Sequence, residues 1–212
     1  MSSNIVITMA RQYGSGGKTI GAMLAKELGI NCYSREILRM ASEESGINER
    51  LFGMSDEKMK GAGWFKILSR PYDGELLPPE DKDFVSEENI FNYQAKIIKD
   101  LAEKESCVIV GRCADYILKD NPNCINVFIC ADRADRIKRI AERYDVSEKK
   151  ALDRIKRMDR ERKYYYETHT GQEWGSISSH EILLNASLLG IEGTVDILEG
   201  IYKRSVSYTH LR

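Results

Sequence analysis

The sequence lacks the segments that direct proteins into or across a membrane. No apolar run among its 212 residues approaches the ~18 residues that a membrane-spanning helix needs. The N-terminus has no basic region followed by an apolar stretch, which a signal peptide would require. We therefore expect a cytoplasmic protein with no membrane partner.

Metal-binding and disulfide patterns are also missing. The five cysteines form no C-x-x-C pair, and the three histidines are scattered along the chain, so no metal cluster is predicted. Four of the cysteines lie within or beside apolar strand-like runs. Buried free thiols in a reducing compartment explain them best.

The chain has almost no net charge. Its 32 Lys and Arg side chains offset 33 Asp and Glu side chains and leave a formal charge of −1, which argues against a general nucleic-acid binder. The balance is uneven, because residues 133–163 hold 13 Lys and Arg against 7 Asp and Glu. We expect small-molecule partners, and the sequence leaves the oligomeric state open.

The stretch from Asn4 to Leu28 has the pattern of a strand, a phosphate-binding turn and a helix. Ile5–Met9 is a short apolar run typical of a buried parallel strand. Apolar residues then recur at helical spacing from Ile20 to Leu28. The glycine-rich turn between them supplies the candidate ATP-binding residues Gly14, Ser15, Gly16, Gly17, Lys18 and Thr19. Backbone N–H groups in such a turn, together with the helix dipole, favour a phosphate.

The turn matches the phosphate-loop pattern G-x-x-x-x-G-K-[ST] at its second glycine, its lysine and its hydroxyl, while Gln12 stands at the first glycine. On this interpretation Lys18 reaches the β and γ phosphates and Thr19 is a ligand of Mg²⁺. The alternative is a flexible turn with a solvated lysine.

Further strands and helices alternate along the chain. The apolar runs predict strands at 32–33, 107–110, 125–130 and 180–184, with helices at 34–45, 86–101, 114–119, 132–140, 147–163 and 190–202. This order predicts an α/β fold in which helices cover both faces of a central parallel sheet. The carboxyl ends of the strands would gather Gly14–Thr19, Ser34–Arg39 and Gly111–Asp115 along one edge.

Two segments stand apart from this pattern within a single domain assigned to residues 1–204. Residues 49–83 are rich in glycine and proline and are predicted to form a mobile insert on the acceptor side. Residues 205–212 continue no pattern, and we expect a disordered tail there.

Arginines gather again in residues 147–175. Arg154, Arg157, Arg160 and Arg162 precede three consecutive tyrosines. A lid that carries such guanidinium groups would neutralise the charge on a transferring phosphoryl group. The alternative is a solvated helix face whose arginines pair weakly with neighbouring carboxylates. Asp115 is the only candidate base near the cleft. This scarcity of bases favours a phosphate acceptor, because a phosphate oxygen is already anionic and needs no base.

Three blocks resemble the bacterial cytidylate kinase-like family, namely residues 10–17 (ARQYGSGG), 108–115 (VIVGRCAD) and 189–195 (LGIEGTV). The resemblance covers residues 4–202. It implies a three-layer P-loop kinase fold with a helical acceptor-binding insert and an arginine-bearing lid. It also implies ATP- and Mg²⁺-dependent phosphoryl transfer to a nucleoside monophosphate, with CMP or dCMP as the first candidates.

The same resemblance assigns roles by residue. It implies catalytic roles for Arg157, Arg160 and Arg162 in the lid and for Lys18 in the phosphate loop. It implies that the acceptor is bound by Ser34, Arg39, Arg112, Asp115, Asp159 and Asn185.

Departures from the family pattern leave alternatives open. Cys113 replaces the aspartate that helps to read cytosine, and Asn185 aligns with a second aspartate near the nucleoside. Both changes remove negative acceptors from the nucleoside side, so a kinase of another small metabolite remains an alternative. Gln12, and the absence of an aspartate at the end of Val108–Val110, leave open a nucleotide-binding module without turnover.

Overall fold

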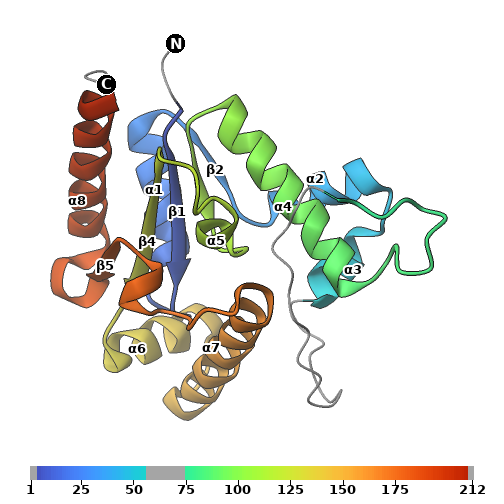
Figure 1. Ribbon diagram of the computed structural model, residues 1–212. Helices are drawn as coiled ribbons and strands as arrows, with labels where there is room; N and C mark the ends of the chain where they lie inside the picture. The colour runs from blue at the N-terminus through green and yellow to red at the C-terminus, as the bar shows by residue number, and fades with distance from the viewer. Residues whose placement is uncertain (1–3, 56–74, 210–212) are drawn as a thin grey trace.

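The computed structural model describes residues 4–55 and 75–209, so the middle of the predicted insert lies outside the described residues. Its centre is a sheet of five parallel strands in the order β2-β3-β1-β4-β5 (Figure 1). The strands are β1 Val6–Arg11, β2 Asn31–Tyr33, β3 Cys107–Val110, β4 Cys124–Cys130 and β5 Ile182–Asn185. Each strand pairs with its neighbours in parallel.

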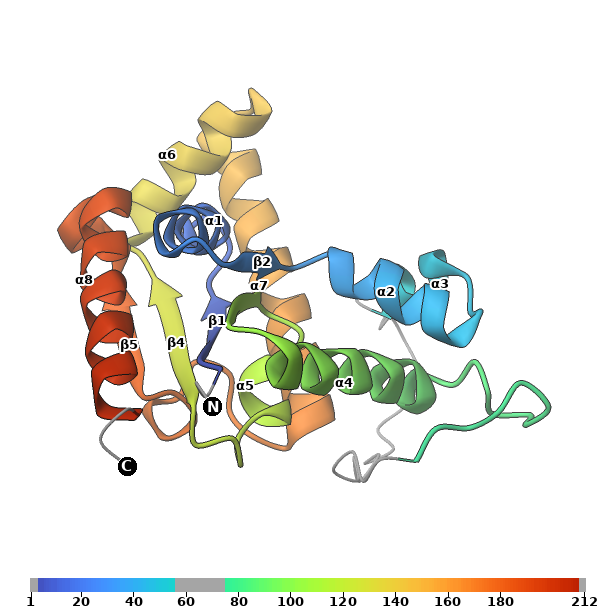
Figure 2. The ribbon, with the colours of Figure 1, turned by 90° about the horizontal axis from the view of Figure 1, so that it is seen from above.

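Helices cover both faces of this sheet. They are α1 Gly17–Leu28, α2 Glu36–Ser45, α3 Glu49–Ser55, α4 Glu87–Lys104, α5 Ala114–Ile117, α6 Arg133–Tyr144, α7 Glu148–Thr170 and α8 Ala186–Thr209, with a 3-10 turn η1 at Ile177–Ser179. Figure 2 shows α1 on one side of the strands and α4 with α5 on the other. The predicted three-layer α/β architecture is confirmed.

Alternating side chains of β3 divide the core into two parts. Val108 and Val110 pack with α1 and α8, whereas Cys107 and Ile109 pack with α2 and α4. This follows from the two-residue period of a strand, which sends successive side chains to opposite faces. All four residues of β3 are buried, as expected for a parallel strand covered on both faces.

Several element boundaries differ from the sequence prediction. Helix α7 runs to Thr170, well beyond Lys163, because Tyr165, Tyr166 and His169 are buried against the rest of the molecule. Strand β5 begins at Ile182 and leaves His180 in the preceding connection. Helix α8 continues to Thr209, so residues 205–209 extend a helix where we expected a separate tail. Residues 210–212 lie outside the described part.

Among the residues that the structure describes, no helix combines the length and the apolar character needed to cross a bilayer. The mobility predicted for the insert stays a prediction.

Candidate active site

The strand order places the candidate site at the carboxyl end of β1. The chain runs from β1 to β2 and β3 on one side, then crosses to β4 and β5 on the other. Ligands of open parallel sheets bind where the strand order reverses in this way. Helices α6 and α7 lie at the tips of these strands (Figure 1), and they carry most of the concentrated positive charge.

The turn after β1 requires glycine for two different reasons. Gly16 has φ of 91°, and a Cβ there would lie 2.8 Å from Cδ1 of Ile191. Gly17 is limited by space, since a Cβ would lie 2.7 Å from Cβ of Arg11. Both positions therefore exclude larger residues.

Gln12, in contrast, fits without strain at the position where the phosphate-loop pattern has a glycine. It is not among the non-glycine residues with positive φ. Its backbone oxygen accepts a hydrogen bond from Oγ of Ser15 at 2.9 Å, and its side-chain oxygen accepts one from the Ala131 N–H at 3.2 Å. The glutamine thus ties the loop to the end of β4.

The start of α1 presents unpaired backbone donors. Within the described residues, no hydrogen bond engages the N–H groups of Gly16, Gly17, Lys18 and Thr19, and no side chain caps the helix. The side chains of Lys18 and Thr19 are exposed. Such free donors at the positive end of a helix dipole are suited to phosphate oxygens.

Arg162 of α7 lies directly against this loop. It donates a hydrogen bond to the Arg11 carbonyl at 3.0 Å, and its guanidinium lies 5.3 Å from the centre of the Tyr13 ring. Burial lowers the pKa of Arg162, the charge of Asp159 opposes this shift, and the charges of Arg136 and Arg112 add to it. Arg112, which follows β3, is therefore near enough to Arg162 for their charges to interact.

The turn that carries Arg112 is strained. Gly111, Arg112 and Cys113 have φ of 83°, 63° and 53° in succession. Two non-glycine residues in the left-handed region are costly, and such strain concentrates at functional sites.

The model of the cytidylate kinase-like family matches residues 6–188. The chain belongs to the cytidylate kinase-like family. The family predicted from three sequence blocks is thereby confirmed, together with the P-loop kinase fold. The comparison with curated proteins found no match.

Solved structures agree with the fold. An uncharacterized protein from Eubacterium ventriosum is 30% identical with a TM-score of 0.69, and the match covers 94% of this chain and 99% of that one. Shikimate kinase from Bacteroides thetaiotaomicron is 14% identical with a TM-score of 0.53, over 94% and 98% of the two chains. Shikimate kinase from Acinetobacter baumannii is 11% identical with a TM-score of 0.50, over 96% of each chain. The two shikimate kinases are similar in fold alone.

In this cytidylate kinase-like protein, the predicted acceptor-side residue Asp115 and the nearby Cys113 are both buried. Asp115 is only 6% exposed and accepts a hydrogen bond from the Tyr166 hydroxyl at 2.6 Å. Burial raises the pKa of Asp115, although the Tyr166 hydrogen bond and the His180 charge oppose that shift. Cys113 is buried among Phe91, Tyr165 and Tyr166.

Asn185 lies at the opposite edge of the sheet from the other predicted acceptor-side residues. It ends β5, whereas Arg112 follows β3 and Ser34 follows β2 at the opposite edge. Its amide nitrogen donates to Oδ1 of Asp132 at 2.9 Å. The structure therefore separates Asn185 from Arg112 and Ser34, which sequence reasoning had grouped with it.

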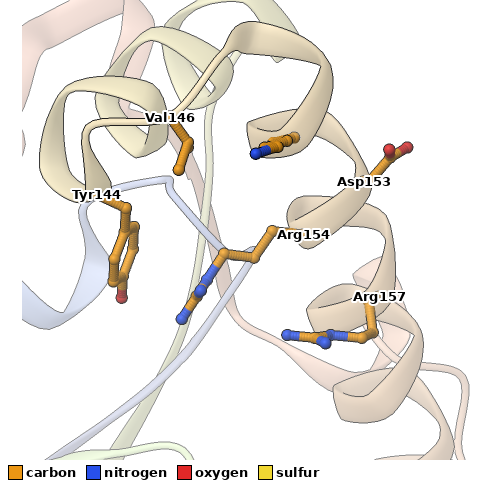
Figure 3. A pocket seen from close by; sticks show the side chains of 6 residues that line it. Tyr144, Val146, Asp153, Arg154 and Arg157 are labelled. Carbon is orange, nitrogen blue, oxygen red and sulfur yellow. The ribbon is translucent and has the colours of Figure 1, made fainter.

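Three of the predicted arginines, Arg39, Arg157 and Arg160, are exposed. Arg39 pairs with Glu43 one turn further along α2. Arg160 is exposed on α7. Arg157 lines a pocket of about 390 Å³ together with Tyr144 and Arg154. Figure 3 shows the side chains of Arg154 and Arg157 pointing into the same space between α6 and α7.

Sequence reasoning missed three charged residues near the loop. Glu36, at the start of α2, is close enough to Lys18 that the lysine charge lowers the Glu36 pKa. Arg136 and Arg139 of α6 bond to the loop backbone. The only sequence signal for this arginine pair is its spacing of three residues on one helix.

Proposed function

We propose that this protein transfers the γ-phosphoryl group of ATP to a nucleoside monophosphate, with CMP and dCMP as the first acceptors to test. The observation that supports this most is that Arg162 bonds to the Arg11 carbonyl, just before the loop with the unpaired N–H groups of Gly16–Thr19. Arg112 is near enough for its charge to act on Arg162. Phosphoryl transfer needs positioning and charge neutralisation more than covalent chemistry. Both requirements are met by these groups.

The residues present fit a nucleotide with its metal ion. The loop N–H groups and Lys18 would bind the phosphates, and the exposed Thr19 hydroxyl would be a ligand of Mg²⁺. Within the described residues, no cluster of three or more His, Cys, Asp or Glu side chains could hold a metal by itself, so most of the other ligands would be phosphate oxygens and water. Mg²⁺ would neutralise part of the negative charge of the phosphates.

A phosphate acceptor agrees with the state of Asp115. The carboxylate of this candidate base is buried and already bonded to Tyr166. A nucleoside monophosphate needs no base, because its second pKa of about 6 leaves an anionic oxygen at neutral pH.

The test is Lys18→Ala, with Lys26→Ala as the control. Lys26 is exposed in the last turn of the same helix, at the end away from the loop. Removal of the Lys18 charge should lower the rate of phosphoryl transfer by roughly 10²–10³-fold, while circular dichroism stays unchanged. Undiminished transfer in Lys18→Ala would refute the proposal.

A second candidate is a kinase of a hydroxyl-bearing metabolite, and Glu36 favours it. Backbone N–H groups of Glu36 and Ser34 lower the pKa of this carboxyl, and the Lys18 charge adds to them. The Ser34 N–H donates to Oε2 of Glu36 at 2.9 Å. An ionised carboxylate near the phosphate-binding lysine is the kind of group that accepts a proton from an attacking hydroxyl.

An acceptor panel with labelled ATP, run on wild type and Glu36→Gln, separates the two. With a phosphate acceptor, Glu36→Gln should have little effect. With a hydroxyl acceptor, it should lower turnover by roughly 10²–10⁴-fold. ATP binding in calorimetry without any labelled product would instead identify a nucleotide-binding module.

A further inference from the structure

The backbone of one residue of the phosphate loop is held on both sides by an ion pair. Nε of Arg136 donates to the Tyr13 carbonyl at 2.8 Å, and another nitrogen of the same guanidinium pairs with Asp159. Oδ1 of Asp159 in turn accepts a hydrogen bond from the Tyr13 N–H at 2.7 Å. The Tyr13 backbone, Asp159 and Arg136 thus form a closed ring of hydrogen bonds.

A second arginine of α6 fixes the next carbonyl. Arg139 donates to the carbonyl oxygen of Gly14. The described residues contain no cis peptide bond, and in a trans peptide the carbonyl and the following N–H point in opposite directions. Fixing the carbonyls of Tyr13 and Gly14 therefore also fixes the N–H groups of Gly14 and Ser15, which point away from the arginines.

The ion pair is rigid because it is largely removed from solvent. The side chains of Arg136 and Asp159 are 9% and 20% exposed, and a buried charge persists only with its partner. The Tyr13 ring is also held, since its hydroxyl lies 3.0 Å from the Tyr144 hydroxyl and 3.0 Å from Nε of Arg154. Helices α6 and α7 therefore support the loop from outside.

We propose that Arg136 and Arg139 are positioning residues of the ATP site. They act through the backbone of Tyr13 and Gly14, and they hold the loop in the conformation that presents its N–H groups to phosphates. This inference rests on the proposed function, because it takes the loop to be the ATP site.

The variants are Arg136→Met and Arg139→Met, with Lys138→Met as the control. Lys138 lies between the two arginines in the sequence but is exposed. Hydrogen exchange of residues 12–19 is measured without nucleotide, ATP affinity by calorimetry and KM for each substrate by turnover. Both arginine variants should exchange the Tyr13 and Ser15 amides, which donate to Asp159 and to the Gln12 carbonyl, faster than wild type. ATP affinity should fall roughly 10–100-fold, as for other residues that orient a binding group. KM for the acceptor and all properties of Lys138→Met should stay unchanged.

Arg136→Met leaves Asp159 without its partner and can unfold the protein. The double variant Arg136→Met/Asp159→Asn removes that buried charge, so its melting temperature should return to that of wild type. Its loop amides should still exchange fast, and its affinity for ATP should stay low. Unchanged exchange and affinity in folded variants would overturn the inference while leaving the kinase proposal intact. A wild type that binds no ATP would overturn both the proposed function and the assignment of this loop to ATP.

Discussion

Just after β3, two residues have backbone conformations that normally suit glycine. Arg112 and Cys113 follow Gly111 in the left-handed region, at a cost of roughly 1–2 kcal/mol for each L residue. The local sequence gives no reason for this cost. It is explained if the guanidinium at position 112 is needed where it lies, near Arg162, and the buried thiol at 113 packs against the aromatic residues of α4 and α7.

Replacing Arg112 should separate stability from function. Arg112→Gly and Arg112→Ala both remove the guanidinium, so both should lower kcat/KM for the acceptor by roughly 10²–10³-fold. Glycine also relieves the backbone strain, so Arg112→Gly should be more stable than Arg112→Ala by about 1 kcal/mol. Urea unfolding measures the difference, and greater stability of the alanine variant would contradict this account.

At the scale of elements, α7 connects three parts of the molecule. Its middle bonds to the phosphate loop through Asp159 and Arg162. One turn later Tyr166 bonds to Asp115 of α5, and His169 stacks on Phe91 of α4 with ring centres 4.3 Å apart. These contacts recur at three- and four-residue spacing, so they lie along one face of the helix.

The contact between α4 and α7 should make stability sensitive to acid. Burial lowers the pKa of His169 to about 4, against about 6.5 in an unfolded chain. As the pH falls through this window, the unfolded chain takes up a proton that the folded protein excludes, so stability is lost on acidification. The loss should reach about 3 kcal/mol at most.

His169→Phe keeps a ring beside Phe91 but cannot take up a proton. Its free energy of unfolding should therefore fall less than that of wild type between about pH 6.5 and about pH 4. Asp115, whose pKa is raised, acts in the opposite direction in both proteins and cancels in the comparison. Urea unfolding at several pH values measures the two slopes, and equal slopes would rule out His169 as the cause.

At the scale of the whole molecule, the topology brings the phosphate loop and a basic helix pair together. The loop after β1 comes early in the chain, while α6 and α7 come more than 100 residues later. Their contact concentrates positive charge beside the loop although the chain as a whole has a formal charge of −1. An anionic ligand should therefore stabilise the fold strongly.

Addition of ATP with Mg²⁺ should raise the melting temperature. At about 100 times Kd, a ligand that binds only the folded state adds about 2.7 kcal/mol, which corresponds to roughly 5–10 °C for a chain of this size. Chelation of Mg²⁺ should reduce the shift, and Lys18→Ala should reduce it further. Scanning calorimetry measures it, and an equal shift in Lys18→Ala would contradict the assigned site.

Sequence patterns determined the features that depend on neighbouring residues. The apolar run of β3, the helical stripe of α1 and the glycines before Lys18 each impose local geometry, so the parallel sheet, the phosphate loop and the family followed from them. The extension of α7 past Lys163 was missed, because Tyr165 and Tyr166 are helical by virtue of what they are buried against. The tertiary structure alone decided which charges meet. Tyr13 and Asp159 are 146 positions apart. Their contact forms only because the chain crosses to the far side of β1, and preferences of neighbouring residues do not predict it.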